Sequence, residues 1–404
     1  MPTAAAFSRP TPSEAAAPRA RPGAAPAFAS VAVVDDIEAA RDAWAEIAPF
    51  AAASPYQGFD FARLWLATIG AARRVAPLIV VARDAAGAVA ALLPLGARAV
   101  GPLRLASFIG GKDANFNLGL FQQGAVWSPQ DLAALLMAAA HAARPRVDAF
   151  PFVNQPGDWQ GASNPFAARP RQPSPSFAYK SALPGDFAAW VNAHASNDAQ
   201  KKLRKKAKRL EAMGPVAHRR AADAREADRL LAAFFVQKNA RMRALGVSDA
   251  YEAPEARAFL SGLAHCGLEA GAPRLELHGL YVGDRVVATF GALAAGDRLS
   301  GLFLSNDGDL EIARSSPGEL IVQAVVRDAI ARGFNTFDLG VGEARYKNEA
   351  CEAEEPLFDG AFGVTALGWV AAQAFLVRQG LKRRVKRSPQ VLALLRRLRA
   401  TASA

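Results

Sequence analysis

The sequence predicts an α/β protein with mixed sheets, in which two similar halves follow one another along the chain. The chain has 404 residues, which is more than one ordinary hydrophobic core accommodates. Each half contains three short strand-like runs, then a helix, then one more strand. Corresponding residues lie at nearly constant offsets, 188 positions from Ser128 to Ser316 and 190 from Asp148 to Asp338. Such internal similarity favours a duplicated fold, although three strands, a helix and a strand also follow one another in unrelated proteins.

The composition is typical of a globular protein, and it argues against a membrane-spanning helix, a disulfide framework and a metal site. Hydrophobic residues make up 51% of the chain and charged residues 21%, which is a usual balance for a packed domain. The longest apolar run, 364–377, is shorter than the roughly 20 residues that a membrane-spanning helix needs. Residues 1–30 are rich in Ala and Pro and lack a compact apolar region, so we expect a disordered leader rather than a secretory signal. The two cysteines and five histidines show no ligand spacing. We therefore expect no disulfide framework, no metal site and a cytoplasmic location.

The second half shows its elements most clearly. Three runs of alternating or apolar residues predict a meander of antiparallel strands, at 275–282, 285–293 and 298–305. Gly283-Asp284 and Gly296-Asp297 are hairpin-type turn pairs between them. Ser316, Pro317 and Glu319 then form a capping-box pattern, which predicts that a helix begins at residue 317. This helix runs to residue 332, and a strand at 334–339 follows it.

The first half repeats this order with a different ending. Its predicted strands are at 78–82, 89–95 and 103–108, followed by a helix at 129–143 that opens at Ser128, and a strand at 147–150. That last strand continues into Phe150-Pro151-Phe152, whereas the last strand of the second half continues into Gly340 and Gly342. Glycines at a strand end let a ligand approach the backbone. We therefore expect the second half to carry the active site.

The net charge of +11 is concentrated in two segments. One is the basic run 201–209, which contains no aromatic residue for stacking on nucleic-acid bases. The other lies in the C-terminal segment 376–404, which we expect to form a basic amphipathic helical tail. Its apolar side is formed by Val391, Leu392, Leu394, Leu395 and Leu398. Such a helix favours an anionic membrane surface; packing on the protein is the equally open alternative.

One combination of motifs carries a family resemblance. Ser316-Pro317-Gly318, a helix, then Phe337-Asp338-Leu339-Gly340 and Tyr346-Lys347 resemble the signature of CelD-like acetyltransferase domains. These belong to the GNAT superfamily and are related to the Fem peptidoglycan aminoacyltransferases, which carry two tandem GNAT-like domains. The resemblance is clear over residues 180–375. It implies a degenerate N-terminal GNAT-like domain at 31–176 and a C-terminal GNAT acetyltransferase domain at 177–375.

The resemblance also implies a donor site. In GNAT folds an acyl-CoA lies between the splayed fourth and fifth strands, with its pyrophosphate over the start of the helix that joins them. In this chain the corresponding helix start offers Ser315, Ser316 and Gly318, where free backbone N–H groups favour phosphate. The strand-end glycines Gly340 and Gly342 complete the expected site. The implied co-substrate is acetyl-CoA or another acyl-CoA.

The chemistry implied is direct transfer of the acyl group to an amine, and the acceptor that the resemblance suggests is an amine on a saccharide of polysaccharide or cell-envelope metabolism. Such transfer needs a proton acceptor for the amine and a proton donor for the thiolate, and no enzyme nucleophile. We expect Tyr346 to be the donor and Asp338 or Glu343 the acceptor. Asp338 fits equally well as a structural residue that holds the turn after the strand.

Three further residues are predicted to contact substrate. Arg345 and Lys347 fit an anionic group on the substrate or on a phosphate. Asn115 lies in the unusually polar segment 110–117, which is either a plain loop or a loop of the first half that faces the substrate. Two other functions stay open. One is a Fem-like aminoacyltransferase that uses aminoacyl-tRNA, and the other is a non-catalytic binding protein of polysaccharide assembly.

Overall fold

The computed structural model describes residues 27–388. The predicted leader up to residue 26, and the tail from residue 389 on with Val391 to Leu398, lie outside the described residues.

The first half contains the strands β1 (Ser30–Val34), β2 (Ala76–Arg83), β3 (Val89–Val100), β4 (Leu103–Phe108), β5 (Leu120–Phe121), β6 (Ala149–Pro156), β7 (Asp158–Trp159), β8 (Ala162–Ser163) and β9 (Arg171–Pro173). Its helices are η1 (Glu38–Ala40), α1 (Arg41–Ile47), η2 (Ala48–Phe50), η3 (Pro55–Gln57), α2 (Phe59–Trp65), η4 (Leu66–Gly70), α3 (Pro129–Ala142) and η5 (Pro165–Ala168).

The rest of the chain contains the strands β10 (Ala178–Ala182), β11 (Val216–Arg220), β12 (Glu276–Val282), β13 (Arg285–Ala295), β14 (Arg298–Asn306), β15 (Thr336–Val341), β16 (Ala353–Glu355) and β17 (Leu357–Gly363). Its helices are α4 (Phe187–His194), α5 (Asn197–Glu211), α6 (Ala224–Ala244), α7 (Pro254–His265), α8 (Leu310–Ala313), α9 (Pro317–Ala331), α10 (Arg345–Ala350) and α11 (Ala366–Arg387).

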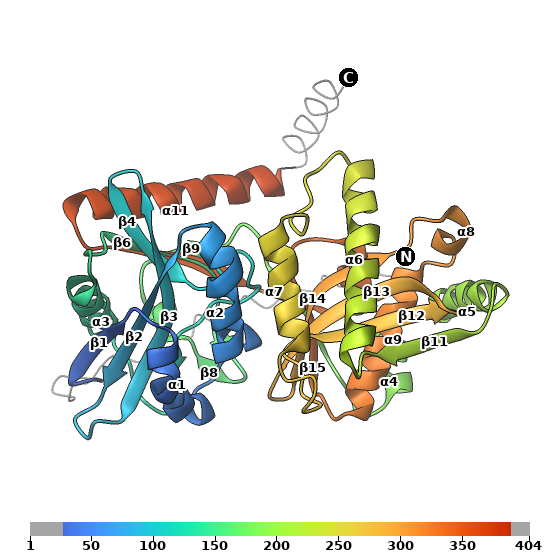
Figure 1. Ribbon diagram of the computed structural model, residues 1–404, viewed down its shortest axis with the longest axis horizontal. Coiled ribbons are helices and arrows are strands. Elements are labelled where there is room, and N and C mark those ends of the chain that lie inside the picture. The colour runs from blue at the N-terminus through green and yellow to red at the C-terminus, as the bar shows by residue number, and fades with distance from the viewer. Residues whose placement is uncertain (1–26, 389–404) are drawn as a thin grey trace, which may run out of the picture.

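Two mixed sheets of the same plan lie side by side (Figure 1). The first has the order β1-β2-β3-β4-β6-β17-β9, and the second has the order β11-β12-β13-β14-β15-β10-β16. In each sheet an antiparallel meander is followed by a helix and by a strand parallel to the last strand of the meander. This order confirms the predicted mixed α/β fold and its repetition.

The register of the two parallel pairs corrects one predicted equivalence. The third residue of β4, Leu105, pairs with Ala149, and the third residue of β14, Ser300, pairs with Asp338. Ala149, and not Asp148, therefore stands where Asp338 stands in the second sheet. A shift of one residue turns a side chain to the other face of a strand. Asp148 instead accepts hydrogen bonds from the backbone N–H of Arg104 (2.8 Å) and from the Thr365 hydroxyl (2.9 Å).

The two sheets exchange a strand. β17 lies late in the chain, inside the predicted second domain at 177–375, but it pairs with β6 and β9 of the first sheet. The equivalent place in the second sheet is taken by β10, which directly follows the first half. The predicted boundary at 176/177 falls between β9 of the first sheet and β10 of the second, whereas β17 and the start of α11 lie with the first half.

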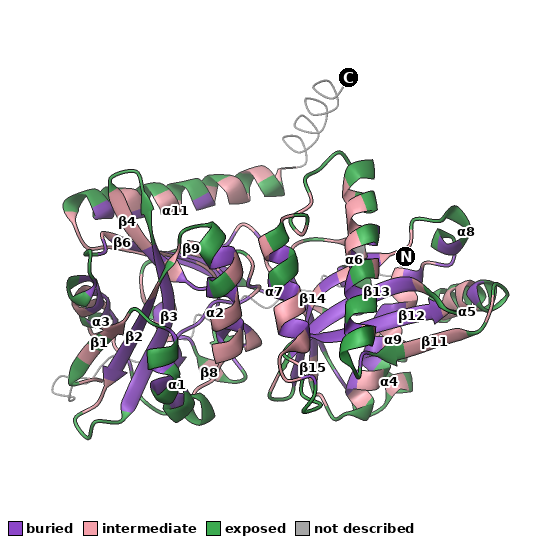
Figure 2. Ribbon diagram, in the orientation of Figure 1, coloured by how far each residue is buried: buried purple, intermediate pink, exposed green. Residues whose placement is uncertain are grey.

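Helices cover both faces of each sheet, and their inner sides are buried while their outer sides are exposed (Figure 2). In the second half, α9 packs on one face of β12–β14 and α6 on the other. In the first half, α3 covers one face, and α1 and α2 cover the other. One shared core joins the halves, since α2 contacts α7 between the sheets.

The two long helices that follow the meanders begin differently. At the start of α3, Ser128 and Asp131 form the complete capping box. At the start of α9, Ser316 has the left-handed φ of +47°, and no side chain among the described residues caps the helix. The predicted capping box at Ser316 is therefore wrong, because this backbone conformation does not aim the hydroxyl at the first turn. Glu319 forms an ion pair with Lys206 instead (2.6 Å).

The C-terminal helix is longer than predicted toward its start. α11 begins at Ala366, ten residues before the expected tail, and runs across the top of the first half (Figure 1). Its contacts are with β6, β9 and β17. No helix among residues 27–388 is long and apolar enough to cross a membrane.

Candidate active site between β14 and α9

A cavity of about 790 Å³ lies in the second half, beside the start of α9. It is enclosed by β14, the first turn of α9, α10 and the C-terminal half of α6. The residues that line it are Lys206, Lys238, Arg241, Met242, Leu245, Tyr251, Leu302, Phe303, Leu304, Asn306, Ala313, Ser316, Pro317, Gly318, Glu319, Ala344, Tyr346 and Glu349. The cavity thus joins a helix start to acidic, basic and phenolic side chains.

The start of α9 leaves space for a ligand atom beside the backbone of Gly318. A Cβ atom on Gly318 would lie 3.6 Å from Leu304 Cδ2 and 3.7 Å from Asn306 Oδ1, which are ordinary contacts. Ser316 and Gly318 both line the cavity.

No side chain of the described part caps α9. Pro317 has no N–H, and the N–H groups of Glu319 and Leu320 donate to the Ser316 carbonyl (2.9 and 3.3 Å), so the Gly318 N–H is the donor of the first turn that is left for an anion. Ser315 is fully buried and is not one of the residues that line the cavity.

Two phenols face the same space. Tyr346, on α10, is half-buried, and burial raises the pKa of its hydroxyl to about 12. Tyr251, between α6 and α7, also has its pKa raised to about 12 by burial. Both phenols therefore carry their protons at neutral pH and can donate them.

Asp338 holds the end of β15 together. Its Oδ2 accepts hydrogen bonds from Arg298 Nε (2.7 Å) and from the Ser300 hydroxyl (2.5 Å), and its Oδ1 accepts one from the Gly340 N–H (2.9 Å). Arg298 also forms an ion pair with Glu355 (2.6 Å). Desolvation opposes the charge of Arg298, but the two carboxylates outweigh it and raise its pKa. Since Asp338 is fully buried and both of its oxygens are engaged, the geometry favours the structural alternative over the proton acceptor.

Asn115 comes from the first half and bridges β14 and β15. The parallel ladder runs from Arg298 to Ser300 on β14. One residue further, Asn115 Nδ2 donates to the Gly301 carbonyl (3.2 Å), and its Oδ1 accepts from the Val341 N–H (3.1 Å). Its amide also donates to the Tyr56 hydroxyl (2.7 Å). Asn115 thus occupies the place where the two strands part.

Of the two strand-end glycines, Gly340 makes room for Asn115, whereas a Cβ on Gly342 would meet no atom within 4 Å. Gly340 has a φ of +66°, and a Cβ on it would lie 2.2 Å from Asn115 Nδ2. Gly342 has a φ of +105°, and neither glycine lines the cavity. The close approach predicted at Gly340 therefore involves Asn115.

The remaining predicted residues lie around the strand end. Lys347 is buried and donates to the carbonyls of Gly340 (3.3 Å) and Val341 (3.0 Å). Desolvation lowers its pKa to about 8. Glu343 is exposed on the loop before α10, and Arg345 begins α10. The roles predicted for Glu343, Arg345 and Tyr346 stay predictions.

Sequence reasoning missed several lining residues. Lys238 and Arg241 stand three positions apart on α6, so both reach the same side of the helix. Burial lowers the pKa of Lys238. Glu349 lies on α10, one turn after Tyr346. The i, i+3 spacing of the two cations was visible in the sequence, but which face of α6 is covered was not.

The equivalent region of the first half is closed. Aromatic side chains pack there between β4, β6 and the start of α3; these are Phe108, Phe121, Trp127, Phe152 and Phe166. Arg169 donates to the carbonyl of Pro129 (2.7 Å) in the first turn of α3. With its helix start capped and its interior filled, this half offers no counterpart to the cavity at α9 within the described residues.

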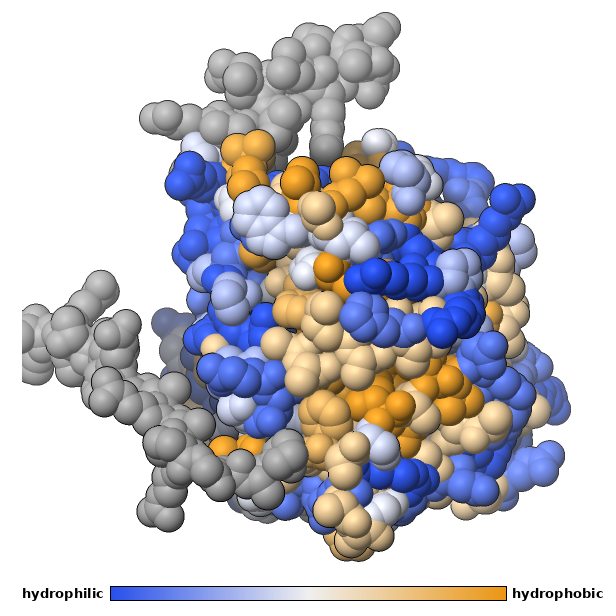
Figure 3. Space-filling view, turned by 90° about the vertical axis from the view of Figure 1, so that its left-hand side faces the viewer, coloured by the Kyte–Doolittle hydropathy of each residue, from blue (hydrophilic) through white to orange (hydrophobic). Residues whose placement is uncertain are grey.

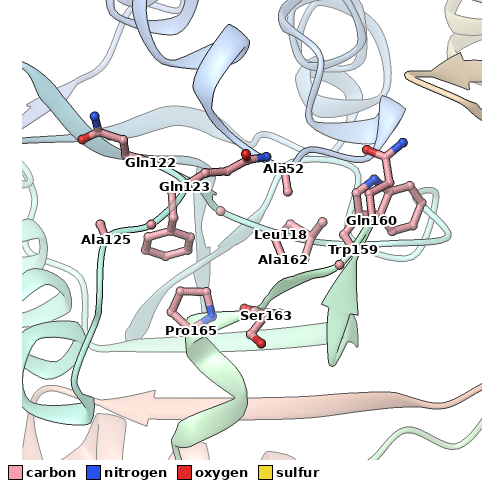
Figure 4. A pocket seen from close by; sticks show the side chains of 15 residues that line it. Ala52, Leu118, Gln122, Gln123, Ala125, Trp159, Gln160, Ala162, Ser163 and Pro165 are labelled. Carbon is pink, nitrogen blue, oxygen red and sulfur yellow. The ribbon is translucent and has the colours of Figure 1, made fainter. Parts of the chain in front are cut away.

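The first half does contain a different cavity, of about 450 Å³, near β5 and the β7–β8 hairpin. Its side chains include Gln122, Gln123, Trp159 and Gln160 (Figure 4). None of the described residues that line it is acidic, basic or phenolic. This cavity is therefore unsuited to proton transfer.

Comparisons with known proteins agree with this division. Residues 197–348 match the acetyltransferase (GNAT) domain family. The chain is similar in structure to FemX, with a TM-score of 0.52 and 10% identity over 79% of this chain and 95% of FemX. It is also similar in structure to a conserved protein of unknown function from Bacteroides thetaiotaomicron VPI-5482. The TM-score is 0.51, with 12% identity over 82% of this chain and 99% of the other. No functionally curated protein matches the sequence.

At these identities the structural likeness is one of fold. The repeated sheet order confirms the predicted arrangement of two tandem halves with one plan, and the match to the GNAT domain family falls in the second of them. The matched residues, 197–348, include all of the residues that line the cavity except Glu349. A group of three His, Cys, Asp or Glu side chains that could hold a metal is not found among residues 27–388.

Proposed function

We propose that this protein is an acyl-CoA-dependent N-acyltransferase that acts in the second-half cavity. The observation that carries the proposal is the open first turn of α9, with Ser316 and Gly318 facing a cavity that also contains Tyr346. Backbone N–H groups and the positive end of the helix dipole favour a pyrophosphate at such a place. Lys206, Lys238 and Arg241 add positive charge for the remaining phosphate.

In this proposal one end of the cavity, at Gly318, binds the acyl-CoA phosphates, and the other end, at Tyr346, contains the reacting thioester. An acyl-CoA supplies the activated acyl group as a thioester. The turn at Gly318 holds the phosphates, and β14 from Leu302 to Asn306 forms the wall along which the rest of the donor lies. Tyr346 stands at the far side and donates its proton to the departing sulfur, since its raised pKa keeps it protonated.

A carboxylate at the rim takes the proton of the attacking amine. Glu343 is the residue proposed from the sequence, and Glu349 lines the cavity beside Tyr346. Asp338 supports both indirectly, because it fixes the strand end from which α10 departs. The product is an amide, formed as the C–S bond of the thioester breaks and a C–N bond forms.

The finer assignment rests on the sequence motifs. We assign the chain to the CelD-like group, with acetyl as the acyl group and an amine on a saccharide of polysaccharide or envelope metabolism as the acceptor. The reaction would take place in the cytoplasm, where acetyl-CoA is available. A dedicated metal ion has no part in this scheme, since proton transfer by side chains suffices.

Binding and turnover can be tested separately. The full chain is titrated calorimetrically with acetyl-CoA and with longer acyl-CoAs, and release of the CoA thiol is then followed with a panel of amino sugars and other amines. The proposal predicts saturable binding of at least one acyl-CoA and amine-dependent thiol release. If no acyl-CoA binds, the proposal is wrong, and the result supports the alternative of a non-catalytic binding protein.

A second function is favoured by the charge on α5. Lys201, Lys202, Arg204 and Lys205 are exposed there, and the helix is joined to the cavity mouth by the ion pair between Lys206 and Glu319. Such a strip suits the phosphates of an aminoacyl-tRNA as donor. Binding of tRNA that weakens steeply with salt, without acyl-CoA binding, would favour this alternative.

A further inference from the structure

Helix α11 is held firmly on the first half by one side only. Gly368, Ala372 and Gln379 are buried against the sheet. Gln379 donates to Asp359, which is buried too. Thr365 caps the start of the helix, and Lys386 near its end donates to the Ser176 hydroxyl (2.6 Å). The orientation of the helix about its axis is therefore fixed.

The opposite side of α11 exposes an apolar stripe. Its members are separated by three or four positions and so share one face of the helix; they are Leu367, Val370, Ala374, Val377 and Leu381. Val377 is 71% exposed and Leu381 60%. Of the large hydrophobic side chains exposed on the described residues, a substantial share lies on this one helix. Hydrophobic residues are visible at the upper edge of this face of the molecule, where α11 begins (Figure 3).

The charges beside the stripe all have one sign. Helix α11 contains no acidic residue and six basic ones, Arg378, Lys382, Arg383, Arg384, Lys386 and Arg387. Arg378 and Arg384 flank the stripe on its two sides at the C-terminal half. Trp369, 58% exposed, lies beside it near the start. An apolar stripe edged by cations and a tryptophan is the pattern of a helix that lies in a membrane interface.

The same charges argue against a second copy of the chain as the partner. Two copies joined through this face would bring Arg378 and Arg384 of each close to those of the other, without a carboxylate on either helix to compensate. An anionic lipid surface supplies the missing negative charge along the C-terminal half of the helix. It also accepts the apolar side chains without requiring a matching groove.

We propose that the outward face of α11 docks the protein on an anionic membrane surface. The apolar stripe enters the boundary between headgroups and acyl chains, and the exposed residues Arg378, Arg384 and Arg387 pair with lipid phosphates. The helix keeps its contacts with the first sheet, so docking needs no change in the fold. The cavity beside α9 belongs to the other half of the molecule and remains accessible.

The protein carries its own probe for this docking. Of its six tryptophans, Trp44, Trp65, Trp127, Trp159 and Trp190 are buried, and only Trp369 on α11 is exposed. The full chain is mixed with vesicles of phosphatidylcholine alone or with one third phosphatidylglycerol. Sedimentation measures binding, and acrylamide quenching measures how far the exposed tryptophan is shielded. We expect binding and shielding with the anionic vesicles and little of either with phosphatidylcholine alone.

Substitutions distinguish docking through α11 from the nonspecific attraction of a basic protein to an anionic membrane. The double substitution Val377→Glu with Leu381→Glu should lower vesicle binding at least about tenfold, because it puts two charges into the stripe. Arg378→Ala should lower it about fivefold, the usual effect of one basic residue near an anionic surface. The matched control is Val126→Glu with Val236→Glu, because both side chains are also highly exposed and neither lines the cavity beside α9. We expect this control to bind as the unmodified protein does.

Two results would overturn the proposal. One is that the double variant of α11 binds vesicles as well as the unmodified protein does, or that vesicle binding is lost only with the double substitution Lys201→Glu and Lys205→Glu on α5. The other is a dimer in sedimentation velocity without vesicles that the α11 double variant dissociates, which would assign the face to a second copy. Circular dichroism and the unfolding temperature check that each variant is folded.

Discussion

Replacing Gly318 by Val tests the donor site with little disturbance of the fold. The first side-chain atom would lie 3.6 Å from Leu304 and 3.7 Å from Asn306, so the backbone need not move. Gly318 has an ordinary φ within α9, where a residue with a side chain is tolerated, and we expect stability to change by no more than about 1 kcal/mol. The two methyl groups, however, would crowd the Gly318 N–H, which is proposed to receive the phosphate.

The expected loss of affinity follows from that hydrogen bond. A hydrogen bond to a charged group contributes about 1.5–3 kcal/mol, so losing one lowers acyl-CoA affinity about 10- to 150-fold. Calorimetric titration measures the affinity, and urea unfolding measures stability. Gly185→Val is the matched control, because a Cβ there meets no atom within 4 Å and the site is distant in sequence from the cavity lining. Equal acyl-CoA affinity in the Gly318 variant and the control would place the donor elsewhere.

Three further predictions concern residues around the strand end. Tyr346→Phe should lower turnover at least about tenfold while acyl-CoA affinity stays nearly constant, since only the donated proton is lost; steady-state kinetics with unchanged turnover would remove Tyr346 from the chemistry. Arg298→Met should lower the free energy of unfolding by about 3–5 kcal/mol, because Asp338 and Glu355 would be left buried without their counter-ion; a change below about 1 kcal/mol in urea unfolding would contradict this ion-pair role. Lys347 should make stability rise with pH between about 8 and 10.5: folding lowers its pKa to about 8, so in that window the unfolded chain binds the proton more strongly. Lys347→Met should lack this rise when urea midpoints at about pH 7.5 and 9.5 are compared, and an equal rise in both proteins would show that other groups cause it.

Local patterns in the sequence were sufficient for the elements of the fold. The meander strands, the helices after them and the parallel strands appear where alternation and turn residues predicted them, as in β4 at Leu103–Phe108 and α9 from Pro317. These features depend on neighbours only a few residues apart, which a sequence shows directly. The choice of the second half as the active one stays a prediction, because the strand-end glycines on which it rested do not line the cavity.

The site could be predicted only in part. The helix start at Gly318 and the phenol of Tyr346 were found from a family resemblance, and both line the cavity. Lys238 and Arg241 were missed because nothing in α6 itself says which of its faces meets β14. The capping box at Ser316 failed because its residues fit the pattern while the backbone adopts a left-handed conformation that the pattern does not encode.

What the sequence determined by itself, then, is the order of elements and their duplication, because hydrogen bonds and side-chain periodicity within each element are local. What only the tertiary structure decided are contacts between distant segments. Asn115 reaches Gly301 across 186 positions and Val341 across 226, and β17 joins the first sheet from the far end of the chain. Such contacts form because the edge strands of each sheet expose unpaired backbone N–H and C=O groups, and because each buried polar group needs a hydrogen-bond partner. Several segments can meet those needs, and packing of the whole molecule selects among them.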